Sequence, residues 1–516
     1  MAGRGGPGLT RRRLRAPHVL LAAVGILALV ARLVPVLGAR ALRGSLSYDE
    51  GVHLVVAQRL LAGQLTYRDV FFAHPPGIVI AQVPIALLGR LVGEPSALAV
   101  SRCVVGGVGA LTAVLVARLL LRRGLLAAAA GGVVAALYAP AVAADRVAML
   151  EPALSLALVV AFGALARPGR GPAVGTRGSL ATGPLAVGGL AVGLALSVKL
   201  WAALDVVVLT AVVAARFGRV AVLRWCAWTA VGTLVVVGPF LVLAPGALWR
   251  DVVQAQVSRP RTGGLGSAHA SVAAAADTVT RPGTSWTVGA FVVLGALAVV
   301  ALVLVVRARV RPWGVLVPAS WPDPVWWAVV GLVHLVALVV APSYYLHYSA
   351  FLTVPIALVA GAVAGRLVRR ARARVPVAVA VAVLAALLVV DLPAVPPGAR
   401  VDNDLLAAEA AGGCVWAREV ELLVLADASR RQIDESCPGR ADLYGERMAT
   451  SLAPDGAAAV DELDGQVVGE LAASHAVLLL SSNPYQGLGP RARSYLDMHF
   501  TATVTTGRVE VWRRRP

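Results

Sequence analysis

The sequence predicts an α-helical protein that crosses a membrane many times and ends in a small α/β domain. Hydrophobic residues make up 58% of the chain and charged residues only 15%. With a mean hydropathy of +0.77, this composition does not suit a water-soluble protein of 516 residues. Apolar runs such as 19–37, 286–306 and 375–390 approach or exceed the roughly 20 residues that cross a bilayer as a helix. Backbone groups in lipid must pair within their own segment, so we expect these runs to be helices.

Basic residues indicate which side of the membrane each loop occupies. The net charge of +19 is concentrated in short clusters between apolar runs, a distribution that argues against nucleic-acid binding. Under the positive-inside rule these clusters predict about eleven spans, with the basic segment 1–16 in the cytoplasm and the C-terminus outside. The first span lacks a convincing small-residue cleavage site, so we expect it to be retained. The predicted spans are 17–38, 98–118, 125–144, 152–166, 182–198, 201–215, 225–245, 286–306, 324–341, 348–365 and 375–395.

Two further helices are expected at the outer membrane surface. Residues 78–92 are shorter than a usual span, and a span here would place Arg122 and Arg123 outside. We therefore expect an interfacial helix packed against the bundle. A second one would cover residues 50–61 if Asp49 is a helix cap. Trp326 and Trp327 are expected in the aromatic belt on the cytoplasmic side.

The composition becomes more polar after Asp391, and residues 396–516 are predicted to form an extracytoplasmic α/β domain. Strand-like and helical patterns alternate here. The expected strands are 422–424, 477–480 and 504–512, and the expected helices are 405–411 and 465–473.

The four cysteines divide between the two parts of the chain. Cys414 and Cys437 lie in the exported domain, where a disulfide between them is plausible. Cys103 and Cys226 lie in apolar spans and are expected to be inert packing residues. No Cys–His spacing resembles a zinc site and no Gly-rich phosphate loop follows a strand. The sequence therefore predicts no metal site and no definite cofactor, and leaves dependence on a divalent metal open.

Polar residues adjoin the apolar runs on the predicted outer side. Solvated loops would give scattered polar residues, whereas acids next to hydrophobic runs favour a site at the membrane surface. The topology places there Asp49 and Glu50, His74, Glu151, Lys199, the 249–285 loop and residues 344–347.

The order of these segments resembles the glycosyltransferase C superfamily. Its nearest members are the protein O-mannosyltransferases and the lipid A aminoarabinose transferases, and the resemblance covers residues 17–395, the predicted catalytic domain. Such enzymes transfer a sugar from a polyprenyl-phosphate carrier to an acceptor on the outer face of the membrane. The similar elements are Tyr48-Asp49-Glu50, His74-Pro75-Pro76, Arg146 to Pro152, Leu196 to Lys199, and Tyr344 to Pro355.

This resemblance implies a multipass cell-membrane enzyme that transfers a hexosyl or pentosyl group. Its partners would be a polyprenyl-phosphate sugar, membrane lipids and an acceptor, either protein, polysaccharide or glycolipid. The carrier already supplies a leaving group, so the enzyme needs a base for the acceptor hydroxyl and cations for the departing phosphate. Asp49 is the expected base of an inverting single displacement; the alternative is a helix cap. Glu50 orients Asp49 or the acceptor, or is a first-turn acid.

Further polar residues are expected to contact substrate or carrier phosphate. His74 stands where the aminoarabinose transferases typically have a lysine, and it is only partly charged at neutral pH. Glu151, with Asp49 and Glu50 an expected catalytic residue, stands where the superfamily usually has Asp, and an ion pair with Arg146 would shape the site. Tyr345 and His347 are site residues or members of the interfacial belt. The expected phosphate contacts are His74, Lys199, Arg146, Arg259, Arg261, Tyr345 and His347.

Two other classes of function compete with this hypothesis. A multipass transporter or flippase would line a path with ionisable residues inside its spans. An envelope assembly scaffold would use the exported domain to bind a partner, but it leaves the pattern of Asp49, His74 and Glu151 unexplained. The ionisable candidates for a transport path are Arg32, Arg102, Asp205 and His334.

Overall fold

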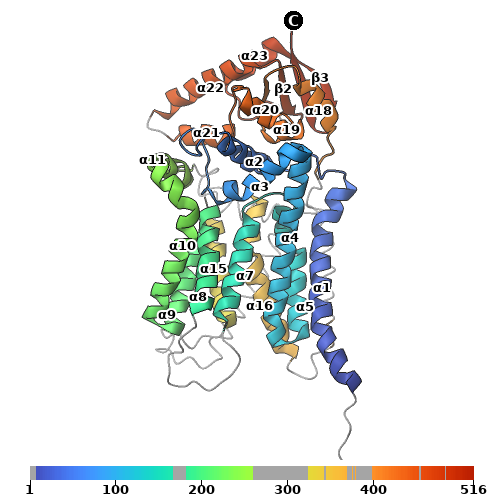
Figure 1. Cartoon of the computed structure of the whole chain (residues 1–516), viewed down its shortest axis with the longest axis vertical. Helices are drawn as coiled ribbons and strands as arrows, with labels where there is room; N and C mark the ends of the chain where they lie inside the picture. The colour runs from blue at the N-terminus through green and yellow to red at the C-terminus, as the bar shows by residue number, and fades with distance from the viewer. Residues whose placement is uncertain are drawn as a thin grey trace, which may run out of the picture.

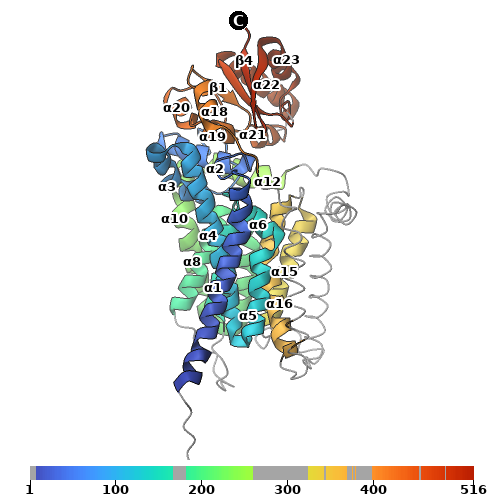
Figure 2. The same ribbon diagram turned by 90° about the vertical axis from the view of Figure 1, so that its right-hand side faces the viewer.

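The fold consists of a helical bundle capped at one end by the C-terminal domain (Figures 1 and 2). The structure, a computed structural model, describes residues 7–166, 182–259, 323–341, 345–368, 375, 378 and 398–516, apart from 453, 454 and 483. The expected span 286–306, most of 375–395, and Arg261 lie outside the described residues. The long helices of the bundle are α1 (Pro7–Gly38), α4 (Glu94–Leu120), α7 (Glu151–Leu165), α8 (Thr182–Val198), α9 (Ala202–Phe217), α10 (Arg219–Leu243), α15 (Asp323–Val340) and α16 (Thr353–Val368).

Several of these helices have the length and composition of membrane spans. Among the described residues, four helices are long and apolar enough to cross a bilayer, and five are if one bent pair is a single span. Helices α7, α8 and α15 are apolar but shorter. The architecture is therefore that of a multipass membrane protein, while the expected count of about eleven spans stays a prediction.

The predicted span 125–144 is broken in the middle. Helices α5 (Leu125–Leu137) and α6 (Ala139–Asp145) meet at 55°. Pro140 has no backbone N–H for the carbonyl of Ala136 four residues earlier, and the backbone is extended at Tyr138 between the two helices. The guanidinium of Arg32 donates to the carbonyl of Ala136 at 2.8 Å, so a side chain replaces part of the backbone pairing lost at the break.

Ionisable side chains inside the bundle form buried pairs. Arg32 of α1 pairs with Asp145 at 2.6 Å, and His334 of α15 lies 2.7 Å from Asp205 of α9. These pairs connect different helices, which is how buried charges are usually accommodated.

The two tryptophans predicted for the aromatic belt are buried instead. Trp326 and Trp327 are 5% and 3% exposed and pack within the bundle core. Trp327 meets Phe162 edge to face, with ring centroids 6.3 Å apart, and the guanidinium of Arg123 lies 5.2 Å from its ring. The belt assignment was wrong because hydropathy does not distinguish a lipid-facing side of a helix from one covered by α16.

Two helices lie between the bundle and the C-terminal domain (Figures 1 and 2): α2 (Tyr48–Leu61) and α3 (Gly77–Val92). Helix α3 matches the helix expected over 78–92. Helix α2 matches the alternative helix over 50–61, but its N-cap is Ser47 and not Asp49. Short elements α11 (Pro245–Leu248), η2 (Trp249–Gln254) and α12 (Ala255–Val257) follow α10 on the same side, and η4 (Leu346–Leu352) precedes α16.

The C-terminal domain has one four-stranded sheet in the order β1-β2-β4-β3. Strands β1 (Val415–Ala417) and β2 (Ala476–Leu480) are parallel, and β4 (Val509–Arg514) is antiparallel to β2 and to β3 (Phe500–Thr506). The prediction of an α/β domain is therefore confirmed. Its helices are α18 (Asn403–Ala410), α19 (Glu421–Leu425), α20 (Ser429–Asp434), α21 (Leu443–Thr450), α22 (Gly456–Ala473) and α23 (Pro490–His499).

Two expected strands differ from the structure. Residues 422–424 belong to helix α19, which buries residues 421, 422, 424 and 425; a short apolar run does not distinguish strand from buried helix. The expected strand 504–512 is the β3–β4 hairpin, which turns at Gly507 with φ +58°.

The expected disulfide is present, with the Cα atoms of Cys414 and Cys437 5.5 Å apart. Cys103 and Cys226 are exposed on their helices, so the expectation that they are packing residues was wrong.

Candidate active site beneath the C-terminal domain

Asp49 lies in the first turn of α2, directly beneath the C-terminal domain. Its side chain is half-buried and forms no hydrogen bond or ion pair within the described part of the chain. His53 follows four residues later, so the two side chains share one face of the helix. An acid without a fixed partner is available to accept a proton from a bound molecule.

A buried ion pair stands opposite this acid. Lys199, in the break between α8 and α9, approaches Glu151 at the start of α7, with Nζ and Oε1 2.5 Å apart. The two side chains are 6% and 2% exposed. The lysine ammonium also lies 4.3 Å from the centre of the Tyr348 ring and 5.1 Å from that of Trp201. Aromatic faces stabilise a cation held out of water.

The expected ion pair between Arg146 and Glu151 was wrong, because Glu151 pairs with Lys199. Arg146 ends helix α6 and is only 3% exposed. The order of residues along the chain made it the nearest cation in sequence, whereas the helix break at Lys199 brings a more distant one into contact.

His74 lies at the end of the loop that leads into α3. Its carbonyl accepts a hydrogen bond from the Tyr67 hydroxyl at 2.8 Å, and its ring centroid lies 5.9 Å from that of Phe72. Burial, followed by the positive charge of Lys199, lowers the pKa of His74 well below its usual range. The imidazole is therefore neutral at physiological pH and can offer a phosphate a hydrogen bond but little charge.

His53 belongs to the same cluster and was not among the residues selected from the sequence. It is 1% exposed, and its Nδ1 lies 2.8 Å from the carbonyl oxygen of Ala148. Since a carbonyl only accepts, Nδ1 carries the proton and Nε2 keeps its lone pair. Burial lowers the pKa of His53. Its spacing of four residues from Asp49 on an expected helix was the available signal.

The remaining described site residues come from two segments that follow the long helices. Arg259 donates from Nη1 to the Tyr348 hydroxyl at 3.4 Å. Tyr345 stacks on His347 with ring centroids 5.7 Å apart, and His347 meets Tyr348 edge to face at 4.8 Å. Tyr345 is 40% exposed, so it lies at the mouth of the cluster.

These segments form one electrostatic neighbourhood. The negative charges of Asp49 and Glu151 both stabilise a positive charge on Lys199 and on His347. The positive charges of Lys199 and Arg259 disfavour a positive charge on His74. The residues from the six expected segments are therefore brought together, with three exceptions. Glu50 is bonded to Arg102, Arg146 is buried at the end of α6, and Arg261 is outside the described residues.

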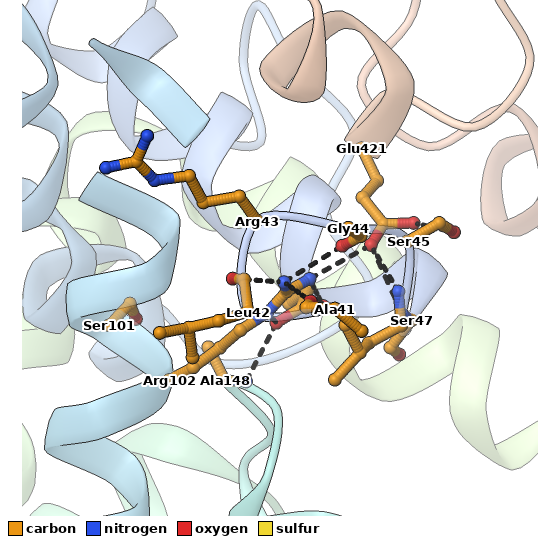
Figure 3. A network of polar contacts seen from close by, with 12 residues as sticks. Ala41, Leu42, Arg43, Gly44, Ser45, Ser47, Ser101, Arg102, Ala148 and Glu421 are labelled. Atoms are coloured by element: carbon orange, nitrogen blue, oxygen red, sulfur yellow. Dashed lines mark hydrogen bonds and ion pairs between the residues drawn. The ribbon is translucent and has the colours of Figure 1, made fainter. Parts of the chain in front are cut away.

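Glu50 belongs to a buried network around Arg102, which Figure 3 shows together with Glu421. Arg102 of α4 donates from Nε to Glu50 Oε2 at 3.0 Å and from Nη2 to Glu421 Oε1 at 3.2 Å. Glu50 is fully buried, so it cannot contact a substrate directly in this arrangement and can act only by holding α2 in place.

A cavity of about 550 Å³ lies beside the cluster. The 67–71 loop, residues 250–255 and helix α21 line it, with Gln254 and Glu446 among the polar residues. Asp49 and Lys199 are not part of its lining, so this cavity adjoins the acid–lysine cluster without including it.

No group of three or more His, Cys, Asp or Glu side chains suited to a metal ion occurs among the residues that the structure describes. The oppositely charged groups of the cluster, by contrast, suit a reaction that moves a proton to a carboxylate and a negative charge toward a lysine.

Comparisons with known proteins identify the fold. No protein-family model matches this sequence, and no curated protein matches it significantly. Among solved structures, ArnT from Cupriavidus metallidurans bound to undecaprenyl phosphate superposes with a TM-score of 0.59 and 14% identity, over 96% of this chain and 97% of that one. The same protein in the apo state gives 0.58 and 16%, again over 96% and 97%.

A solved structure of another protein is also similar. The Archaeoglobus fulgidus oligosaccharyltransferase, in complex with zinc and sulfate, gives a TM-score of 0.51 and 11% identity over 95% of this chain and 73% of that one. At such low identity these similarities establish the fold. Nearly the whole chain, including the C-terminal domain, takes part in the likeness to ArnT.

Proposed function

From the fold of the glycosyltransferase C enzymes, which this chain shares, we propose that the protein is a membrane glycosyltransferase with a polyprenyl-phosphate sugar as donor. The single observation that carries the proposal is the half-buried, unbonded carboxylate of Asp49 near enough to the buried Lys199 to influence its charge. One of the similar structures is bound to undecaprenyl phosphate, which supports a polyprenyl carrier. The N-terminus would be cytoplasmic, and the acceptor would approach from the extracytoplasmic side.

The reaction is a single displacement at the anomeric carbon of the sugar. An acceptor hydroxyl forms the new C–O bond while Asp49 takes its proton, and the bond to the phosphate oxygen breaks on the opposite face. The electron pair leaves with polyprenyl phosphate, whose added negative charge is stabilised by Lys199 and Arg259. Inversion of the anomeric configuration follows.

The other selected residues have supporting roles in this proposal. His74 donates a hydrogen bond to the phosphate in its neutral form, and His347 and Tyr345 line the approach. Glu151 holds the Lys199 ammonium in place. Glu50 and Arg146 position neighbouring segments, and Arg261 is kept as a phosphate contact two residues beyond Arg259. The acceptor is a protein hydroxyl, a polysaccharide or a glycolipid.

The test compares envelope glycans by mass spectrometry in a deletion strain complemented with different variants. Wild type should restore a sugar that the deletion strain lacks, and Asp49→Asn should not, because an amide cannot accept the proton. Asp69→Asn is the matched control, since Asp69 is an acid on the same side that pairs with the exposed Arg68. Full restoration by Asp49→Asn at equal membrane abundance would refute the proposed base. Retention of anomeric configuration would exclude a single displacement.

A further inference from the structure

One carboxylate of the C-terminal domain binds the segment that leads into α2. Oε1 of Glu421 accepts hydrogen bonds from the backbone N–H groups of Leu46 and Ser47, at 2.9 and 3.3 Å. Its Oε2 accepts from the hydroxyl of Ser45 at 3.0 Å. Ser47 is the N-cap residue of α2, but its own side chain makes no capping bond. Glu421 therefore supplies, from more than 370 positions away in the sequence, the acceptor oxygens that this helix N-terminus does not find in its own N-cap side chain.

The same residue packs against α2 where that helix has no side chain. A Cβ atom added to Gly51 would lie 2.4 Å from the backbone nitrogen of Glu421 and 2.5 Å from its Cα. Both neighbours are backbone atoms that cannot rotate away. Helix α19 and α2 are therefore in direct backbone contact two residues after Asp49.

Arg102 of α4 also attaches the start of α2 to the C-terminal domain. Its guanidinium bonds to Glu50 and Glu421, and Nη1 donates to the carbonyls of Ala41, Leu42 and Gly44 at 2.8 to 3.1 Å (Figure 3). One cation thus connects α4, the segment before α2, and the C-terminal domain. Such a buried network has few alternative arrangements, because each displaced charge would lose its partner.

These contacts leave one residue of the segment unattached. Ser45, Leu46 and Ser47 bond to Glu421, the Tyr48 hydroxyl donates to Asp442 Oδ1 at 2.6 Å, Glu50 bonds to Arg102, and Gly51 packs on α19. The structure describes all of residues 45–51. Among them, Asp49 is the one residue that neither hydrogen-bonds to Glu421, Asp442 or Arg102 nor packs its backbone on α19. The attachments hold its neighbours, whereas the Asp49 carboxylate stays unbonded and near enough to Lys199 and His347 to influence their charge.

We infer that Glu421 is a positioning residue for the transfer reaction: it fixes the first turn of α2 and so the direction of the Asp49 carboxylate. This inference rests on the proposed function. The first N–H groups of a helix have no partners within the helix, so without Glu421 the first turn would lose its anchor. A misplacement of about 1 Å can reduce a rate by about 100-fold. The C-terminal domain is then a part of the catalytic unit, not a separate acceptor-recruiting module.

The experiment compares two glutamates, each of which hydrogen-bonds across the boundary between the C-terminal domain and the helices beneath it. Glu94 at the start of α4 accepts hydrogen bonds from the backbone N–H groups of Ser429 and Arg430, at 3.1 and 2.7 Å. It therefore docks the C-terminal domain as Glu421 does, but away from the first turn of α2. The full-length variants Glu421→Ala, Glu421→Gln and Glu94→Ala are purified and assayed with the polyprenyl-phosphate sugar whose residue the deletion strain lacks. Thermal midpoints and the affinity for undecaprenyl phosphate are measured in parallel.

The expected result is a loss confined to turnover. Glu421→Ala should lower kcat by about 100-fold with unchanged donor KM and unchanged affinity for undecaprenyl phosphate. Glu421→Gln, which keeps an oxygen for Leu46 and Ser47, should recover part of kcat. Glu94→Ala should lower the thermal midpoint comparably but keep kcat.

A second pair of variants covers the case in which Glu421→Ala does not fold. Gly51→Ala should lower kcat, whereas Gly89→Ala should not, because the nearest atom to its added methyl group lies at an ordinary 3.6 Å. Equal kcat in the Glu421 and Glu94 variants, or loss of kcat only in proportion to loss of stability, would overturn the inference. If Asp49→Asn also keeps activity, the proposed base has failed, and with it the part of the proposed function on which this inference rests; if Asp49→Asn is inactive, only the inference has failed.

Discussion

Replacing Lys199 with methionine tests whether its pair with Glu151 is ionised and what it contributes. Methionine keeps the apolar length of the side chain but leaves a carboxylate without its ammonium 2.5 Å away. Both side chains are almost fully buried, at 6% and 2% exposure, so water cannot replace the lost partner. In addition, Glu151 Oε2 makes no hydrogen bond within the described part of the chain. Breaking such a pair typically costs about 3 to 5 kcal/mol.

The assay is a double-mutant cycle on unfolding in detergent mixed with increasing sodium dodecyl sulfate. Lys199→Met and Glu151→Gln should each be destabilised, while the double variant should be less destabilised than their sum, because no charge is left unpaired. The double variant should nevertheless stay inactive, since the cation for the leaving phosphate is absent. A loss below about 1 kcal/mol in Lys199→Met, the range of an exposed pair, would refute the argument from burial.

Three further predictions concern other parts of the protein. The disulfide closes a loop of 23 positions between Cys414 and Cys437, so its reduction should cost about 3 kcal/mol; an unchanged thermal midpoint in dithiothreitol would contradict this. Burial and then the charge of Glu50 raise the pKa of Glu421 from its ordinary 4.5 to about 8. The folded state therefore binds the proton more tightly, and stability should fall as pH rises from 4.5 through 8; Glu421→Gln should flatten this slope of thermal midpoint against pH. Arg259→Ala should weaken binding of undecaprenyl phosphate by about 10- to 100-fold through loss of a charge-assisted contact, whereas Arg68→Ala, at an exposed position, should not.

Sequence patterns identify helices better than the places where they break. The apolar run through residues 125–144 has continuous hydropathy, yet Pro140 divides it into α5 and α6. The break is tolerated because Arg32, more than 100 positions earlier, donates to the exposed carbonyls. A residue that appeared in the sequence only as a candidate for a transport path thus has a structural partner. No local pattern could reveal that partner, since it depends on how α1 packs on α5.

The candidate site shows the same division between local and tertiary information. The neighbourhood of Asp49, His74, Glu151 and Lys199 could be expected from their order and their positions beside apolar runs. The choice of Lys199 as the partner of Glu151 could not, because it is decided by the distance between two helix ends. For the same reason nothing near Glu421 in the sequence indicates that it caps a helix in another domain.

The buried ion pairs also bear on the alternative of a transporter. A path through the bundle would require ionisable groups that face water or exchange partners during helix movement. Instead, Arg32 is bonded to Asp145, Arg102 to Glu50, and His334 to Asp205, and each of these side chains is at most 6% exposed. Each pair connects two helices that transport would have to separate, at the cost of leaving a charge unpaired in a low-dielectric interior. The four candidate path residues are therefore better explained as attachments that hold the bundle, and the layer between α2 and α4, in one arrangement. A rigid arrangement of this kind suits a site whose acid and cation must keep a fixed separation during group transfer.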